Sequence, residues 1–219
     1  LNKTTLEIEK SESETLVATI DPENTTDDKT LTWTTSNKEV AEVDSNGKVT
    51  GKSEGTATIT VKTSNGLTAS CKVTVTKQIP SINYQAHVQD IGWQTSKKDG
   101  EMDGTTDQKK RMEAIKISLS DTSSYSGKVE YRAHVQDIGW QDWVSDGILS
   151  GTENQSKQIE AIEIKLTGDI AETYDIYYRV HVQELGWMDW AKNGASAGTA
   201  GFSYRIEAIE IRLVEKGKE

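Results

Sequence analysis

The chain has 219 residues, of which 34% are hydrophobic and 27% charged, with only two prolines. This composition is typical of a globular protein, and no apolar run approaches the roughly 18 residues of a membrane-spanning helix. The formal net charge of −10 argues against nucleic acid and anionic membranes as partners, because binding phosphate groups relies on clustered lysine and arginine. We therefore expect no nucleic-acid partner and no membrane insertion.

Residues 1–76 are rich in threonine, valine and serine, and contain short runs in which apolar and polar residues alternate. Alternation in "GTATITV" and "CKVTV" gives each predicted strand one apolar face, formed by Ala57, Ile59, Val61, Cys71, Val73 and Val75. Asn-Gly occurs between such runs at 46–47 and 65–66, and it is the strongest short-range hairpin signal. Several short strands at this spacing predict a β-sandwich, with Trp33 in its core.

The stretches "LTWTTSNKEVAEVDSNGKVTGKSEGTATITV" at 31–61 and "TASCKVTVT" at 68–76 resemble the bacterial immunoglobulin-like domain of group 2. The resemblance implies a rigid spacer or adhesion module of a surface or secreted protein, without chemistry of its own. No polar residues converge into a site in this block, and the single cysteine is interpreted as a buried structural thiol. The domain is predicted to span 1–77, because Pro80 interrupts any strand that continues beyond it.

The rest of the chain contains three copies of one sequence, which begin at Tyr84, Tyr131 and Tyr178, 47 residues apart. They align without gaps over 84–119, 131–166 and 178–213. Columns shared by all copies include His-Val-Gln, Gly-Trp, Gly-Thr and Glu-Ala-Ile-x-Ile-x-Leu. A unit of about 36 residues is too small to fold alone, so the copies must share a core. We predict an all-β chain whose second domain, 78–219, is a closed pseudo-threefold β fold, either β-prism-like or β-trefoil-like.

Each copy has the pattern of a strand-rich unit. In the second copy we expect a long strand at 129–136, a tight Asp-Ile-Gly turn, and a second strand from Trp140. Turns are predicted at 146–147 and 151–152, followed by a last strand at 158–166. Apolar residues in that last strand change parity partway along, which predicts a β-bulge or a strand buried on both faces.

The residues "YRAHVQDIGWQDWVSDG", the Gly-Thr pair and "RIEAIEIRL" resemble the clostridial hydrophobic repeats that share a tryptophan, often called ChW repeats. The match covers all three copies. The resemblance implies a secreted or surface-attached bacterial protein whose repeats bind polysaccharide, cell-wall glycan or another surface protein. Because the chain begins with Leu1 rather than methionine, we interpret it as an excised or processed segment.

Tryptophan follows glycine in every copy, at Trp93, Trp140 and Trp187, and a second tryptophan follows three residues later in two copies only. Since positions i and i+3 of a strand point to opposite faces, we expect the shared tryptophan in the core and the second one outside. An exposed indole beside carboxylates and amides suits a sugar ring. The candidate ligand-binding residues are Trp143, Trp190, Asp142, Asp189, Gln136 and Gln183. Contact with a protein partner and packing between copies remain alternatives.

Histidine recurs at one column, as His87, His134 and His181. In a threefold assembly these three imidazoles would bind zinc if they met on the axis, which makes them weak metal candidates. The alternative is that each holds a local turn. We expect no cofactor.

Glutamate recurs at Glu113, Glu160 and Glu207, with Arg111 and Arg205 two residues earlier on the same predicted strand face. This spacing predicts structural ion pairs. No nucleophile with a paired base, no phosphate-binding loop and no strong metal spacing is present in the sequence. We therefore expect a non-catalytic module, which the two resemblances place outside the bacterial cell. Glycan binding is the main expectation, and a protein–protein adhesion or assembly module, or a purely structural stalk, is the alternative.

Overall fold

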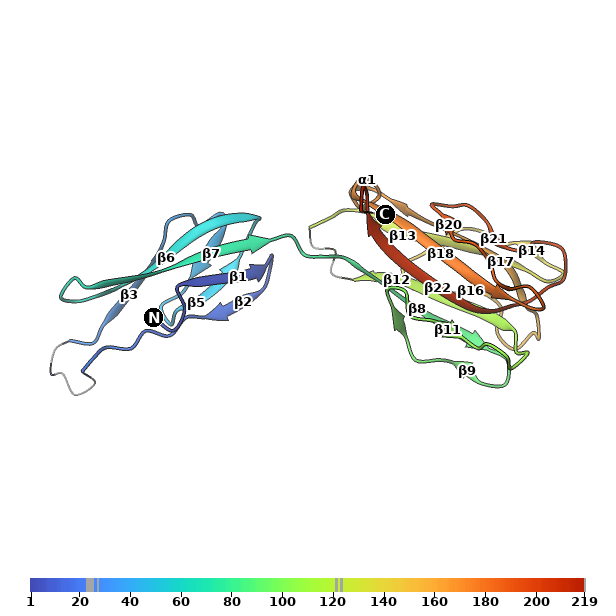
Figure 1. The fold of residues 1–219 in the computed structure, drawn as a ribbon, viewed down its shortest axis with the longest axis horizontal. Helices are drawn as coiled ribbons and strands as arrows, with labels where there is room; N and C mark the ends of the chain where they lie inside the picture. Colours follow the sequence, from blue (N-terminus) through green and yellow to red (C-terminus); the bar gives the residue numbers. More distant parts are fainter. Residues whose placement is uncertain (23–25, 27, 121, 123, 219) are drawn as a thin grey trace. The chain divides into compact units, whose positions relative to one another are not determined.

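The computed structural model of the chain describes residues 1–22, 26, 28–120, 122 and 124–218. Contacts divide it into two compact units, Leu1–Ile79 and Pro80–Glu219. Both units consist of β-strands joined by turns, as Figure 1 shows, and the described residues include a single short helix, α1 (Asp169–Thr173). The all-β prediction is therefore confirmed.

The first unit is a sandwich of two sheets (Figure 1). One sheet has the order β1 (Thr5–Glu9), β7 (Thr68–Thr76), β6 (Gly55–Thr63) and β3 (Leu31–Thr35). The other has the order β2 (Ser13–Thr15), β5 (Lys48–Gly51) and β4 (Ala41–Val43). Strands β1 and β7 are parallel, and the other neighbours are antiparallel. The two Asn-Gly pairs lie between β4 and β5 and between β6 and β7, as predicted.

The core of this sandwich contains the apolar faces predicted from alternation. Its fully buried residues include Ala57, Ile59, Val61, Cys71, Val73 and Val75. Burial raises the pKa of the Cys71 thiol, which fits a structural role. Trp33 is only partly buried and packs against the core instead of lying within it, so its predicted core position holds only in part. Its indole lies over Gly47, where a Cβ would come within 2.8 Å of Trp33 Cζ2.

The second unit consists of three five-stranded sheets of the same design (Figure 1). The first has the order β10 (Lys97–Lys98), β8 (Ser81–Val88), β12 (Met112–Ser120) and β16 (Ser150–Gly151), with β9 (Gly92–Trp93) on β8. The second has the order β14 (Gly139–Trp140), β13 (Lys128–Val135), β17 (Ile159–Thr167) and β21 (Ala197–Gly198), with β15 (Val144–Ser145) on β13. The third has the order β11 (Asp103–Gly104), β22 (Ile206–Glu215), β18 (Tyr174–Val182) and β19 (Gly186–Trp187), with β20 (Ala191–Lys192) on β18.

Each sheet contains one short strand from another copy, so the three copies are linked in a ring. Strand β16 pairs with β12, β21 with β17, and β11 with β22. The Gly-Thr pair makes this joint, since Thr152 N donates to Glu113 O at 2.8 Å. A Cβ at Gly151 would lie 2.3 Å from the same oxygen. The turn predicted at 151–152 is therefore wrong: Ser150–Gly151 is a strand that joins the copies.

The tyrosine that begins each copy makes a second joint. The Tyr131 hydroxyl accepts from Ile117 N at 3.0 Å, in the preceding copy, and donates to Ile148 O in its own turn. Tyr178 repeats this arrangement, and Tyr84 closes the ring by accepting from Ile211 N at 3.3 Å. Burial raises the pKa of Tyr131 to about 12, so the hydroxyl keeps its proton.

One hydrophobic core collects apolar residues from all three sheets, which confirms the shared core and the triplicated design. The sheets nevertheless remain open and do not close into a barrel, so the expected closure is wrong. Of the two predicted architectures, three separate sheets are nearer to a β-prism. The predicted bulge is present in each long last strand; in β17 the pairing register skips Glu160, between Ile159 and Ala161.

Candidate functional site

The outer face of each sheet carries a row of side chains from the long first strand. Residues on β18 alternate between buried and partly exposed, and Tyr177, Arg179 and His181 point outward. The bulge in β22 brings Glu207 to the same face, where its Oε2 lies 3.2 Å from His181 Nδ1. The pairs His87–Glu113 and His134–Glu160 repeat this contact at 3.1 and 3.2 Å. The atoms lie within ion-pair distance, but the angles do not meet hydrogen-bond geometry.

The shared tryptophan packs against this histidine on the outer face, and it is not a core residue. Ring centroids lie 5.3 to 5.6 Å apart in the three copies, with edge-to-face geometry, for Trp93–His87, Trp140–His134 and Trp187–His181. The predicted burial of the shared tryptophan is therefore wrong. Strand β14 ends at Trp140 and β15 begins at Val144, so the period of two does not extend across the gap to Trp143.

In the third copy the aromatic rings and cationic side chains form one continuous stack. The guanidinium carbon of Arg179 lies 4.9 Å from the Trp187 ring and 4.8 Å from the Trp190 ring. That of Arg212 lies 4.3 Å from Trp190 and 5.7 Å from Tyr177. The guanidinium groups of Arg179 and Arg212 thus both lie within 5 Å of the Trp190 ring.

The second copy has a shorter version of the stack. Arg132 lies 4.9 Å from Trp140 and 4.8 Å from Trp143, and Lys165 Nζ lies 4.2 Å from Trp143. Here Lys165 occupies the column of Arg212, and Glu130 replaces Tyr177, so the stack ends in an ion pair of 3.2 Å.

The first copy has one tryptophan on its outer face, where the other copies have two. Lys116 Nζ lies 4.2 Å over Trp93, and Ser96 replaces the second tryptophan. The Trp93 indole N–H is also bonded to Glu153 at 2.7 Å. The three outer faces therefore share the His-Glu-Trp group and differ in what extends from it.

Carboxylates neutralise most of the stacked cations. Arg132 Nε donates to Glu163 and Arg179 Nε donates to Glu210, both at 2.7 Å. Arg212 is exposed, and its side chain has no hydrogen bond or ion pair to any residue that the structure describes.

The six predicted ligand-binding residues all lie on or beside these faces. Asp142 and Asp189 are exposed, while Gln136 and Gln183 are partly exposed. Gln183 Oε1 accepts from Arg205 at 2.8 Å. Trp143 and Trp190 are partly buried, and each has two cationic side chains within 5 Å of its ring.

The three histidines do not meet on an axis. Each lies on the outer face of its own sheet beside its own glutamate. The weak prediction that the three imidazoles meet to bind zinc is therefore wrong. No cluster of three or more histidine, cysteine, aspartate or glutamate residues suited to a metal ion occurs in the described part of the chain. The predicted arginine–glutamate pairs are confirmed, since Arg111–Glu113 and Arg205–Glu207 are 2.6 and 2.7 Å apart.

Sequence reasoning missed the Arg and Lys partners of the tryptophans. Arg132 and Arg179 lie eight residues before Trp140 and Trp187. The signal was present in the alternation of β13 and β18, which places those arginines on the histidine face.

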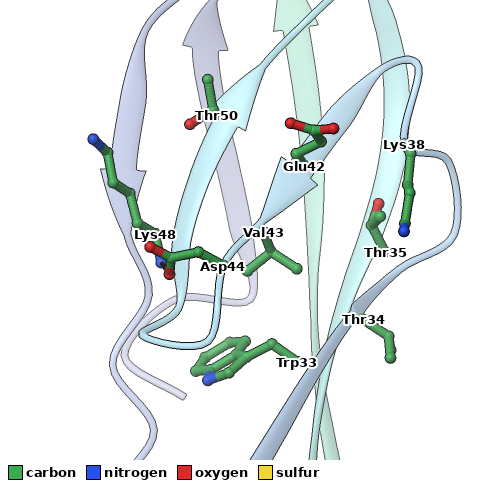
Figure 2. A pocket seen from close by; sticks show the side chains of 9 residues that line it. All are labelled: Trp33, Thr34, Thr35, Lys38, Glu42, Val43, Asp44, Lys48 and Thr50. Carbon is green, nitrogen blue, oxygen red and sulfur yellow. Dashed lines mark hydrogen bonds between the residues drawn. The ribbon is translucent and has the colours of Figure 1, made fainter.

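A hollow of about 560 Å³ opens on the Ig-like unit, lined by Trp33, Glu42, Asp44, Lys38 and Lys48 among others (Figure 2). Polar side chains line this hollow, but it does not show that they form a functional site. Several of these groups already serve the fold. Asp44 accepts from Lys48 N at 2.9 Å, and Glu42 pairs with Lys52 at 3.0 Å.

Comparison with protein families divides the chain in the same way as the structure, into a first unit and a triplicated second unit. Residues 1–75 match the bacterial Ig-like domain (group 2), and residues 87–121, 134–168 and 181–215 match the clostridial hydrophobic W family. The chain consists of a group 2 bacterial Ig-like domain followed by three ChW repeats. Both are non-catalytic module families, and together they indicate a module of a surface or extracellular protein. None of the described helices is long and apolar enough to cross a membrane.

Three curated relatives match part of the chain. An uncharacterized protein of Clostridium acetobutylicum is 40% identical over 74 residues, which is 33% of this chain and 8% of the relative. Lacto-N-biosidase of Bifidobacterium bifidum is 39% identical over 72 residues, 33% of this chain and 6% of the enzyme. The minor capsid protein of Enterobacteria phage T3 is 41% identical over 75 residues, 34% of this chain and 17% of that protein. The chain thus spans less than a fifth of each of these relatives.

Proposed function

We propose that this chain is a non-catalytic binding module of a bacterial surface or secreted protein, and that its ChW repeats bind polysaccharide or cell-wall glycan. The observation that carries the proposal is the outer face of the second and third sheets. There, partly exposed tryptophans stand beside guanidinium groups and exposed carboxylates, among them Asp142 and Asp189. Sugars present hydroxyl groups that charged donors and acceptors bind, and apolar C–H groups that pack against the faces of aromatic rings.

Multiplicity supports the same proposal. The His-Glu-Trp group occurs on three separate sheets, and its histidine and tryptophan are partly exposed in each. A polymer with repeated units can engage several weak sites at once, which raises overall binding well above that of one site. The Ig-like unit would then serve as a spacer. One partial relative, lacto-N-biosidase, is named as an enzyme that acts on a sugar.

A retention assay with the whole chain tests this proposal. The chain is incubated with insoluble polysaccharides and purified cell walls, beside a Trp143→Ala, Trp190→Ala double variant. We expect one glycan to retain the chain, its soluble oligosaccharide to compete, and the double variant to lose retention. The loss would follow because both tryptophans hold the cations in place.

The control is Leu67→Ala, which removes a 68% exposed aliphatic side chain from the Ig-like unit. This variant should be retained like the parent chain. Failure of every glycan to retain the parent chain would contradict the proposal.

A protein partner is the second candidate, and one observation favours it. The turn that follows the first long strand carries a large exposed aliphatic residue in every copy: Ile91, Ile138 and Leu185, 47 to 55% exposed. Because the same position is exposed and aliphatic in all three copies, a protein partner would find three equivalent apolar contacts. If a protein is the ligand, serine at these three positions abolishes retention on cell walls, protease treatment of the walls abolishes it too, and soluble sugars do not compete.

A further inference from the structure

We infer that the outer face of the third ChW repeat is an anion-binding site, and that the ligand group is an oxyanion carried by the glycan. The site is centred on Arg212. That a glycan carries the anion rests on the proposed function. The anion site itself rests on the geometry of β18, β20 and β22.

The first step is how Arg212 is held. Its guanidinium carbon lies 4.3 Å from the Trp190 ring and 5.7 Å from the Tyr177 ring. Arg212 and Tyr177 are also direct partners across the β18–β22 ladder. A guanidinium that stacks by its flat face keeps its N–H donors in the plane, pointing past the ring edges. Stacking therefore fixes the cation without using its donors.

The second step is that these donors have no carboxylate partner. Arg132 and Arg179 are stacked in the same way, but each donates its Nε–H to a glutamate at 2.7 Å. Arg212 has no such bond to any described residue, and it is exposed. Among the three stacked arginines, Arg212 is therefore the one whose N–H donors are available to an oxyanion. A guanidinium group binds an oxyanion in a bidentate manner.

The third step is the comparison of equivalent columns. In the second copy the column of Arg212 holds Lys165, which Glu130 neutralises at 3.2 Å. In the first copy it holds Ser118, and the column of Tyr177 holds Asn83. In the third copy Lys192 Nζ lies 5.0 Å from the Tyr177 ring, but Asp175 neutralises it at 2.7 Å, so the unneutralised charge of this row is that of Arg212. The site is therefore specific to one copy and not a general property of the repeat.

The chemistry of the ligand follows from these groups. A carboxylate, sulfate or phosphate oxygen pair accepts the in-plane donors of Arg212, while the ring edges of Trp190 and Tyr177 contact the carrier. Because the guanidinium is already ordered by its two rings, binding loses less conformational freedom than it would at a mobile surface arginine. An acidic polysaccharide supplies such groups at regular intervals.

Two measurements on the whole chain test the inference. In the first, the chain is titrated with inorganic phosphate at low ionic strength while NMR follows the Nε–H signals of Arg132, Arg179 and Arg212. We expect the shift to be confined to Arg212. An unchanged Arg212 signal, or equal shifts at all three arginines, would overturn the anion site.

The second measurement compares polygalacturonate with its methyl ester, which keeps the backbone and removes the charge. We expect at least tenfold tighter binding to the acid form, and loss of that difference in Arg212→Gln, because a charge-assisted bidentate contact is removed. The matched control Lys165→Gln removes an already neutralised cation at the same column and should keep the preference. Equal loss in both variants would overturn the assignment to the third repeat.

The two proposals fail in different ways. If both polymers bind equally well, the glycan-binding function stands and the anion inference falls. If phosphate shifts Arg212 but no polysaccharide binds, the anion site stands and the glycan-binding function falls.

Discussion

The first and third ChW copies share a backbone and a core but present different outer faces. In the first, Trp93 is bonded to Glu153 and only Lys116 lies over its ring. In the third, Trp187, Trp190 and Tyr177 alternate with two arginines. Since the joints between copies are the same in both, the difference lies on the surface. Identity among the copies therefore reflects assembly more than binding.

The shared columns explain how the ring of three copies is held together. The tyrosines and the Gly-Thr pairs bond one copy to the next, and the glutamate lies in the bulge that receives the Gly-Thr strand. The histidine and the first tryptophan are shared as well, although they lie outside. They cover the bulge from the outer face, as His134, Trp140 and Glu160 do in the second copy.

The largest expected effect on stability comes from disrupting the contact between two copies at Gly151. Gly151 has φ of +108°, and a Cβ there would lie 2.3 Å from Glu113 O. Gly139 has φ of +89° but no atom within 4 Å of its Cβ position. We expect Gly151→Ala to lower the free energy of unfolding by about 3 kcal/mol or more, and Gly139→Ala by about 1. Five of the six tryptophans lie in the repeat unit, so urea unfolding followed by tryptophan fluorescence reports on it. Equal losses would contradict a close inter-copy contact.

A buried carboxyl makes the first copy pH-sensitive. Asp103 occupies the position of Ser150 and Ala197, and desolvation raises its pKa to about 6, against the opposing effect of bonds from Ala86 N and Gly104 N. A carboxyl with a raised pKa binds its proton more tightly when folded, so its ionisation lowers stability as pH rises from about 4 to 6.

We expect Asp103→Ser to remove this dependence. The stability of the variant relative to the parent should rise by up to about 3 kcal/mol between pH 4 and pH 7. The measurement is the free energy of unfolding of both proteins over this pH range. A constant difference between them would show that Asp103 does not titrate in this window.

The tyrosine joint should have a smaller effect. Tyr131→Phe removes the hydroxyl that bonds Ile117 N and Ile148 O, and leaves the buried amide without a partner. We expect a loss of about 1 to 3 kcal/mol in unfolding free energy. The control is Tyr177→Phe, because Tyr177 lies on the outer face and contributes its ring to the stack. If both variants lose the same unfolding free energy, the hydroxyl of Tyr131 does not stabilise the contact between copies.

Much of this structure follows from the sequence by elementary rules. Alternation placed Ile59 and Cys71 in the sandwich core, and the parity change in the last strand indicated a bulge, which the structure places at Glu160. The outward position of Trp140 could not be derived in this way, because the residues between β14 and β15 are irregular. Nor could the strand at Ser150–Gly151, since its partner lies in another copy and two residues carry no periodicity. Local patterns predict local geometry, whereas the contacts between copies depend on the assembled ring.

The smallest expected effect would sharpen the contrast between the copies. If Trp190 holds Arg212 in place, the two side chains should be energetically coupled, and a double-mutant cycle with Trp190→Ala and Arg212→Gln should give about 0.5 to 1 kcal/mol. The equivalent cycle with Trp143 and Lys165 should give less, because Glu130 also holds the lysine. Equal coupling in both copies would mean that the ion pair adds no constraint. The third face would then differ from the second only in its unneutralised charge and not in the rigidity with which that charge is presented.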